Sequence, residues 1–379
     1  MLRVAIVGCG KIADDHAAQI ARMPNAELAG FCDSEILMAK QMHERFNRAP
    51  CFDDVDELLT KVRPDVVHIT TPPESHFGIT RRCLLANCHV YVEKPFTIDA
   101  LEAETLIRTA EERGRTLTVG HNYSFTSSTI RMRALIKKGF LGGPPVHMES
   151  YYCYNLGDTA YVRAFLGDKH HWLRRLPGRL LHNLISHGIC RIAEHIGSDP
   201  QIVLAHGFGS RVLDSLGEIE IEDELRVVIR SEYTTAYFTF STQMRPLLSQ
   251  FRIYGPKNGL VVDDHQDTLM KLRGDKYKSY LENLVPPLSL ATQYLANAAS
   301  NARRLLNHDL NMNGTLRTLI REFYESIETG APPPIPHREI LVTARIMDAI
   351  FKQIGASHRR RSDDLATSSR PAIEAINRV

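Results

Sequence analysis

The sequence lacks the cysteine patterns of a disulfide framework or of a zinc site. Its seven cysteines are odd in number, scattered along the chain and without a CxxC pair. They are typical of reduced thiols that are mostly buried as small apolar side chains. No set of His, Cys, Asp and Glu residues has the spacing of metal ligands either, so we predict no metal.

Long apolar runs and an excess of charge of one sign are also missing. No run approaches the ~20 apolar residues of a membrane span. The N-terminal stretch, residues 1–7, is short and is interrupted at Gly8, too soon for a signal peptide. With 46 Lys and Arg against 44 Asp and Glu, the net charge is only +2, which gives no reason to expect nucleic acid or an anionic membrane as a partner. We therefore expect a cytoplasmic protein that binds neither.

The 379 residues suffice for two or three domains, and the first 122 alternate between strand and helix patterns. Such alternation predicts a doubly wound parallel sheet, with ligands outside the carboxyl ends of its strands. We assign residues 1–122 to this Rossmann domain. Its first strand, residues 3–7, leads into Gly8-Cys9-Gly10-Lys11-Ile12-Ala13 and then a helix. In this motif Gly8 permits a tight turn, and Gly10 lets backbone amides approach a pyrophosphate.

An acidic residue follows the second predicted strand, residues 27–32. Asp33 lies about twenty residues beyond the glycine motif, where a carboxylate accepts hydrogen bonds from the adenosine ribose and repels a 2′-phosphate. The sequence thus favours NAD over NADP, although Ser34 leaves room for a phosphate.

Three further strands of this domain end in polar or catalytic residue types. Residues 65–70 run into Thr71-Pro72 and His76, residues 90–92 into Glu93-Lys94-Pro95, and residues 116–119 into Gly120-His121-Asn122-Tyr123. Pro95 restricts Lys94 to an extended conformation, so its side chain has a defined direction. Alone, Lys94 could equally be an ordinary surface ion pair with Glu93 or a donor to a reacting oxygen. The convergence of these strand ends favours the second reading.

Residues 123–355 change character and form our second predicted domain. Strand patterns at 146–152, 203–211, 225–231, 236–242, 251–254 and 260–263 follow one another with few long helices between them. They predict an α+β domain with an open, mainly antiparallel sheet that helices cover on one face. We expect the tail, residues 356–379, to be disordered.

One helix of this second half carries two polar residues beside its apolar stripe. Residues 180–196 fit a single helix, in which Asn183 and His187 are four residues apart on one face. A lone histidine beside a core stripe is more often structural than catalytic.

A basic loop and an apolar helix complete the second half. The loop contains Arg163, Arg174 and the only tryptophan, Trp172. It is either a solvated cover of the site or a receptor for a phosphate, uronate or pyrophosphate group. The helix over residues 288–305 is either an inter-subunit or a core-covering element, with membrane-surface contact as the weaker alternative.

Three stretches together resemble the Gfo/Idh/MocA family of oxidoreductases, which includes glucose–fructose oxidoreductase and inositol dehydrogenase. They are Ala5-Ile6-Val7-Gly8-Cys9-Gly10, Thr70-Thr71-Pro72-Pro73-Glu74-Ser75-His76 and Val92-Glu93-Lys94-Pro95. The similarity runs from residue 1 to about 355. It implies that Lys94 lies by the nicotinamide and the substrate.

The resemblance also implies a role for the helix at residues 180–196, where family members carry an Asp-x-x-x-His pair. His187 matches the histidine and becomes the expected general acid and base, whereas Asn183 replaces the aspartate and can only orient groups. Tyr123 and Ser124 stand where many relatives have arginines. We therefore expect Lys94 and His187 to be catalytic. The expected substrate-binding residues are Asn183, Tyr123, Asn122, Arg163, Trp172 and Arg174. The expected cofactor-binding residues are Gly8, Gly10, Lys11, Ile12, Asp33, Thr71, Pro72, His76, Glu93, Lys94 and Asn122.

The function that the resemblance implies is hydride transfer between NAD and a secondary alcohol or ketone of a sugar, cyclitol or nucleotide sugar. Two alternatives stay open. Some relatives use bound NAD only transiently, for epimerisation, sugar–sugar oxidoreduction or glycoside cleavage without net redox change. A non-catalytic NAD-sensing regulator is the alternative from another class. Family habit also implies a homo-oligomer, either a dimer or a tetramer.

Overall fold

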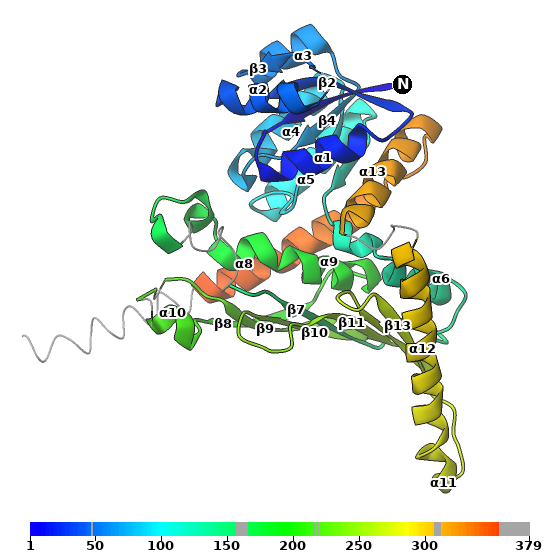
Figure 1. The fold of residues 1–379 in the computed structure, drawn as a ribbon. Coiled ribbons are helices and arrows are strands. Elements are labelled where there is room, and N and C mark those ends of the chain that lie inside the picture. Colours follow the sequence, from blue (N-terminus) through cyan, green and yellow to red (C-terminus); the bar gives the residue numbers. More distant parts are fainter. Residues whose placement is uncertain (47, 157–165, 216, 219, 307–311, 356–379) are drawn as a thin grey trace, which may run out of the picture.

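A six-stranded parallel sheet forms the N-terminal part of the chain in the computed structural model (Figure 1). The structure describes residues 1–46, 48–156, 166–215, 217–218, 220–306 and 312–355, so that Arg163 and the predicted tail lie outside it. The strands of the N-terminal sheet are β1 (Leu2–Val7), β2 (Ala26–Cys32), β3 (Cys51–Phe52), β4 (Val66–Ile69), β5 (His89–Val92) and β6 (Leu117–Val119), in the order β3-β2-β1-β4-β5-β6. This is the predicted doubly wound Rossmann arrangement.

Helices pack on both faces of this sheet. They are α1 (Lys11–Ile20), α2 (Ile36–Arg45), α3 (Val55–Val62), α4 (His76–Leu85) and α5 (Ala100–Arg113). Local sequence sets the ends of α5, since the Asp99 carboxylate accepts a hydrogen bond from the Glu102 amide and Gly114 follows the helix in the left-handed region, at φ 60°. The strand order reverses between β1 and β4, and ligands of such folds bind at that point.

A second sheet of seven strands lies below the first in Figure 1. Its strands are β7 (His147–Cys153), β8 (Ile202–Phe208), β9 (Glu224–Ser231), β10 (Thr234–Ser241), β11 (Ser249–Tyr254), β12 (Asn258–Asp263) and β13 (Thr268–Arg273), in the order β13-β12-β11-β7-β10-β9-β8. The sheet is mainly antiparallel, as predicted, but β7 pairs in parallel with β10. The strand expected over residues 203–211 stops at Phe208, and α10 (Arg211–Ser215) follows it.

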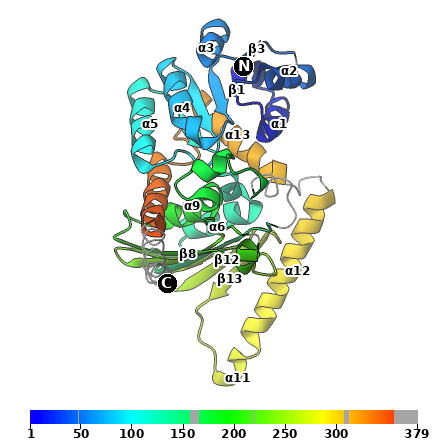
Figure 2. The ribbon, with the colours of Figure 1, turned by 90° about the vertical axis from the view of Figure 1, so that its left-hand side faces the viewer.

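Among the described residues, helices cover the face of this sheet that lies toward the Rossmann domain (Figure 2). They include α6 (Ser127–Lys137), α8 (Arg179–Leu184), α9 (Ser186–His195) and the last helix, residues 337–355. On the other face the side chains of Leu204, Val228 and Tyr237 are 59%, 42% and 50% exposed. The single helix predicted over residues 180–196 is wrong in one respect, because α8 ends at Leu184 and α9 begins at Ser186.

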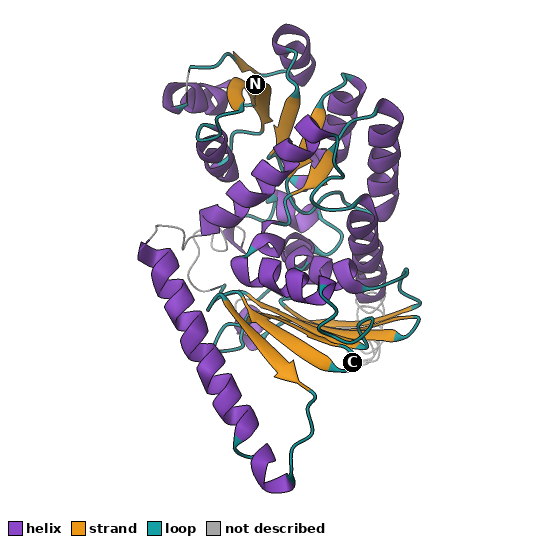
Figure 3. Cartoon of the chain, turned by 90° about the vertical axis from the view of Figure 1, so that its right-hand side faces the viewer, coloured by secondary structure: helices purple, strands orange, loops and turns teal. Residues whose placement is uncertain are grey.

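Two helices near the end of the chain leave the second sheet. The apolar face of α13 (Met312–Thr329), with Leu319, Phe323 and Tyr324, belongs to the core of the Rossmann sheet. The first sheet therefore draws core residues from the range that we predicted as the second domain. By contrast, α11 (Ser279–Glu282) and α12 (Val285–Leu306) form an arm that projects beyond the second sheet (Figure 3). Among the described helices, none is long and apolar enough to cross a membrane.

Candidate active site

A cavity of about 490 Å³ opens at the carboxyl ends of β1, β2 and β4. This volume suits a small-molecule ligand. Five predicted cofactor residues line the cavity: Gly8, Gly10, Asp33, Thr71 and Pro72. Lys11 and Ile12 begin α1 directly after Gly10 and are exposed.

The two glycines of the first turn serve different purposes. Gly8 has φ +93°, and a Cβ at this position would lie 2.6 Å from the Thr71 nitrogen, so the loops after β1 and β4 could not approach as they do. A Cβ on Gly10 would meet nothing within 4 Å, and the space beside this residue at the start of α1 is open. An open cradle beside a helix N-terminus fits a pyrophosphate, and this turn can therefore hold a dinucleotide.

Carboxylates surround the far end of the cavity. The Asp33 side chain is fixed by the backbone amides of Cys9 (2.7 Å) and Glu35 (2.9 Å), and the exposed Asp53 and Asp54 also line the cavity. Arg82, another lining residue, donates to Asp56 at 3.3 Å. The fixed Asp33 carboxylate suits ribose hydroxyls, and the added negative charge opposes a 2′-phosphate.

Lys94 extends from the end of β5 toward the second domain. Its Nζ donates to the backbone oxygen of Asn183 at 3.2 Å and to the side-chain oxygen of Asn183 at 3.3 Å. Burial lowers the pKa of Lys94, and the neighbouring Glu93 carboxylate opposes this shift. An ordinary ion pair with Glu93 therefore does not describe Lys94 fully. The Glu93 charge supports the charged form of Lys94, but the ammonium itself points to α8.

Glu93 is held by a buried chain of polar side chains. Its carboxylate contacts His16 Nε2 at 3.0 Å, His16 Nδ1 lies 2.8 Å from His68 Nδ1, and His68 Nε2 lies 2.9 Å from the Tyr324 hydroxyl. Burial would raise the pKa of Glu93, but the hydrogen bond and charge of His16 and the charge of Lys94 outweigh burial and lower it. Burial lowers the pKa of His68 far below its usual range, so this ring is neutral.

The ionised Glu93 fixes the first hydrogen bond in this series of side chains. Glu93 is an acceptor because it is ionised, so His16 donates from Nε2. The direction of the other two bonds depends on the charge of His16: a charged ring donates from Nδ1 to His68, and a neutral ring accepts there. In both cases the contacts tie α13 to the residue next to Lys94.

His187 approaches the same region from α9. Burial lowers the pKa of His187 far below its usual range, and the positive charge of Lys94 and the nearby His121 lower it further. His187 is therefore neutral at physiological pH and can accept a proton. Its Nδ1 is buried and has no hydrogen-bond partner among the described residues, nor has either ring nitrogen of His121.

Two tyrosines form an aromatic wall around His187. The ring of Tyr123 lies 4.6 Å from the His187 ring and the ring of Tyr152 lies 5.3 Å from it, measured between centroids. Tyr123 is half-buried, whereas Tyr152 is 8% exposed. Such a wall suits the apolar face of a sugar ring, and the phenol groups can bind hydroxyls.

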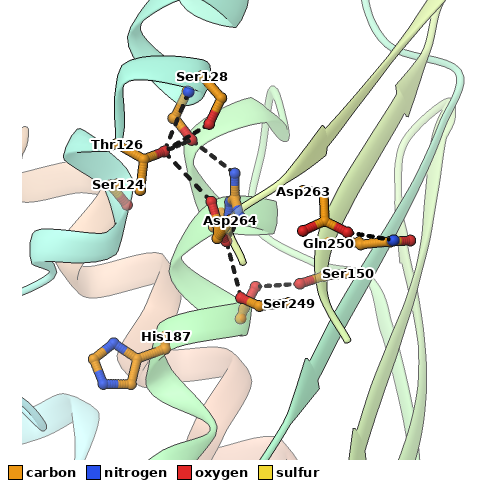
Figure 4. A network of polar contacts seen from close by, with 12 residues as sticks. Ser124, Thr126, Ser128, Ser150, His187, Ser249, Gln250, Asp263 and Asp264 are labelled. Atoms are coloured by element: carbon orange, nitrogen blue, oxygen red, sulfur yellow. Dashed lines mark hydrogen bonds and ion pairs between the residues drawn. The ribbon is translucent and has the colours of Figure 1, made fainter. Parts of the chain in front are cut away.

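A buried ion pair fixes α9 from behind. Arg191, one turn after His187, donates to Asp264 at 2.5 Å and to the Thr129 hydroxyl at 2.8 Å, and Asp264 also accepts from Ser249 at 2.9 Å. Figure 4 shows His187 pointing away from this network. The network joins α9 to α6 and to the second sheet, so it sets the direction of the imidazole.

Other predicted site residues have structural partners. His76 is fully buried, with Nδ1 at 2.9 Å from the Pro95 oxygen and Nε2 at 2.8 Å from the Thr71 oxygen, so it joins two loops and does not line the cavity. The Asn122 amide donates to Thr315 at 3.5 Å. Trp172 packs against the second core.

The arginines of the basic loop pair with glutamates. Arg174 contacts Glu218 at 2.7 Å and 3.2 Å, and Arg175 contacts Glu74 at 2.6 Å and 2.7 Å. These pairs compensate much of the positive charge that suggested a phosphate receptor.

Several site residues escaped the sequence analysis. His121 was noted at a strand end without a role, while Tyr152, His16, His68 and Tyr324 were not predicted. For His68, the signal was its position as a polar residue within the apolar stretch 66–69. Within the described ranges, no three His, Cys, Asp or Glu side chains gather as metal ligands would.

Comparison with known proteins bears on both halves. Residues 2–121 match the family model described as "Oxidoreductase family, NAD-binding Rossmann fold". D-glucoside 3-dehydrogenase of Escherichia coli is 34% identical over 142 residues, which are 37% of this chain and only 40% of that relative. The scyllo-inositol 2-dehydrogenase (NADP(+)) of Bacillus subtilis is 24% identical over 83% of both chains.

A solved structure extends the likeness to the whole fold. The WlbA dehydrogenase from Bordetella pertussis, in complex with NADH and UDP-GlcNAcA, superposes with a TM-score of 0.72 over 94% of this chain and 96% of that chain, at 16% identity. At this identity the likeness concerns the fold alone. The glycine turn, the Glu93-Lys94-Pro95 motif and the match over residues 2–121 show that the N-terminal part of the chain has the NAD-binding Rossmann fold of the Gfo/Idh/MocA oxidoreductase family.

Proposed function

We propose that the protein is an NAD-dependent dehydrogenase that oxidises a secondary alcohol of a sugar or cyclitol. The observation that carries the proposal is that the Lys94 ammonium of the first domain donates to Asn183, which lies four residues before the buried His187 of the second. Lys94 donates a hydrogen bond and His187 accepts a proton, which is the pair that alcohol oxidation requires.

The proposed roles follow from these protonation states. Bound NAD supplies the hydride acceptor. His187 takes the hydroxyl proton, and Lys94 donates a hydrogen bond to the same oxygen and stabilises its developing negative charge. Asn183 holds Lys94 through its two oxygens, and Tyr123 and Tyr152 orient the sugar ring. In the reverse direction, both groups donate to the carbonyl oxygen.

The cofactor and the substrate class are narrowed by charge. Asp33, Asp53 and Asp54 favour NAD over NADP in the cavity beside Gly8 and Gly10. Glu218 and Glu74 neutralise Arg174 and Arg175, which favours a neutral glycoside or cyclitol over a nucleotide sugar. Among the relatives, the glucoside and inositol dehydrogenases carry the names of such compounds, whereas WlbA was solved with the nucleotide sugar UDP-GlcNAcA. The domain limits, residues 1–122 and 123–355, remain part of this proposal. We also propose a cytoplasmic location, because all seven cysteines are free.

The proposal is tested by a substrate screen with purified protein. Glucosides, inositols and UDP-sugars are each mixed with NAD or NADP, and reduced nicotinamide is followed by absorbance. We expect reduction of NAD by a glucoside or cyclitol. Chemical change of a sugar without accumulating NADH would instead indicate a reaction without net redox change. NADH binding with no turnover of any compound would indicate a regulator.

Lys94→Met is the matched test of the site. We expect kcat to fall by about 10²–10⁴-fold, because the developing charge loses its donor, while NADH affinity stays within about threefold. Lys61→Met, which removes an exposed lysine of α3, is the control. Equal kcat in the Lys94 and Lys61 variants would remove Lys94 from the mechanism.

A further inference from the structure

The outer face of the α12 arm carries an apolar seam with the spacing of a coiled coil. Its residues are separated alternately by four and three positions: Leu284, Leu288, Ala291, Leu295, Ala298, Ala302 and Leu305. All seven are exposed, and Leu295 is 72% exposed. This spacing is that of heptad positions a and d, which face a partner helix in a coiled coil.

The inner face of the same helix is polar and already has a partner. The Asn297 side chain exchanges two hydrogen bonds with the backbone of Leu269, at 3.1 Å and 3.2 Å. Gln293 does the same with Lys271, at 2.7 Å and 3.2 Å. These amides pair with the free edge of β13, which is the outermost strand of the second sheet.

The polarity of α12 is thus the reverse of an ordinary surface helix, which buries its apolar face and exposes its charges. Residues 283–302 contain no charged side chain at all. The distal half of the arm also extends past the sheet (Figures 2 and 3). An exposed apolar seam of this length is typical of a surface that binds another molecule.

We propose that α12 pairs with α12 of a second copy of this chain in an antiparallel coiled coil. In one antiparallel register every central layer combines one large and one small side chain. Leu284 meets Ala302, Leu288 meets Ala298, and Leu295 meets Ala291 of the other copy. A parallel pair would place leucine on leucine and alanine on alanine, which alternates crowding with voids.

The surface available on the arm is adequate for a specific dimer. Its large exposed apolar side chains are Tyr280, Leu284, Leu288, Tyr294, Leu295, Leu305 and Leu306. At roughly 100 Å² for each, one copy contributes on the order of 700 Å², close to the ~800 Å² per partner of a standard interface. The contact is isologous, so it closes into a two-fold pair.

A membrane surface is the rival partner, and the charge distribution disfavours it. Helices that lie on membranes carry Lys and Arg along their polar face. On α12 that face consists of amides bonded to β13, and basic residues occur only at its end, as Arg303 and Arg304. A second copy, which presents the same uncharged seam, is the better fit.

The first experiment compares molar masses of the full-length protein by light scattering. We expect the unsubstituted protein to contain at least two chains and Leu295→Glu to have half its mass. Ser289→Glu is the matched control, because it places the same charge on an exposed position off the seam and should leave the mass unchanged. Circular dichroism and NADH titration verify that both variants are folded.

A cross-link tests the antiparallel register. The two-fold axis of the proposed pair passes at the level of Gln293, so Thr292 of both copies lies beside it. Thr292→Cys should give a disulfide-linked dimer under mild oxidation, and Ser289→Cys should not. Three results would each overturn the proposal: a monomeric unsubstituted protein, an unchanged mass of Leu295→Glu, or binding of a monomeric arm to phosphatidylserine vesicles.

Discussion

At the residue scale, the site depends on how the charge of Lys94 is held. Two oxygens of Asn183 accept from its ammonium, while Glu93 stands next to it along the chain. Family resemblance implies an aspartate where this chain has Asn183. Among the described residues, Glu93 is the carboxylate whose charge opposes the effect of burial on the pKa of Lys94, and the Asn183 amide adds no second negative charge.

Asn183→Asp tests this balance. A carboxylate within hydrogen-bond distance of the ammonium favours its charged form and raises the pKa of Lys94. Activity requires protonated Lys94 as a donor, so it is lost as pH rises through that pKa. The alkaline limb of the pH profile of kcat/KM should therefore move up by about one unit. Asn283→Asp, an exposed position, is the control. An unmoved limb would mean that another group sets it.

The buried chain behind Glu93 makes a second residue-scale prediction. Tyr324→Phe keeps the ring but removes the hydroxyl that lies 2.9 Å from His68 Nε2. Because His68 is fully buried, its nitrogen loses its partner without gaining water, and the free energy of unfolding should fall by about 1–3 kcal/mol. Urea denaturation measures this loss, and Tyr280→Phe, at a position 69% exposed, should show none.

At the scale of elements, the sequence predicted those helices and strands that apolar periodicity and capping residues mark. Strand and helix patterns, Asp99 and Gly114 placed the Rossmann elements, and Gly8, Gly10, Asp33, Thr71 and Pro72 line one cavity. Prediction failed where tertiary contacts decide. The break at Ile185 has no glycine or proline to announce it, and nothing local signals that α13 packs under the first sheet.

The helices on the second sheet make a prediction about stability and pH. Glu339, at the start of the last helix, has its pKa raised to about 7 by burial and by the nearby Glu194 carboxylate, against the opposing charges of Arg133 and Arg338. A raised pKa in the folded state means that the neutral form is favoured there. The contribution of Glu339 to stability is complete below about pH 4.5 and is lost as pH rises through 7.

Glu339→Gln fixes the neutral form. At pH 8 the variant should be more stable than the unsubstituted protein by about 1–3 kcal/mol, and at pH 4 the two should agree. Denaturant titrations at both values measure the difference. Glu282→Gln on the exposed arm should show no such dependence, and a gain at pH 4 equal to that at pH 8 would exclude ionisation as its cause.

At the scale of the whole molecule, the candidate site draws its residues from both domains. Lys94 and the cofactor cavity come from the first sheet, while Asn183, His187 and Tyr152 come from the second domain. The ion pair between Glu74, beside the cavity, and Arg175, on the loop before α8, spans the two. Because Glu74 lines the cavity, this contact ties the loop before α8 to the cavity rim, and we expect it to slow the release of NADH.

Arg175→Gln tests this contact. Both partners are partly exposed, at 60% and 30% of their side chains, so the pair is a weak surface contact. The NADH dissociation rate, measured by stopped-flow fluorescence, should rise by no more than about fivefold, and high salt should reduce the difference. Glu74→Gln should have the same effect, and the double variant should add little to either single one. Fully additive effects would show that the two side chains act independently and that the loop is held by other contacts.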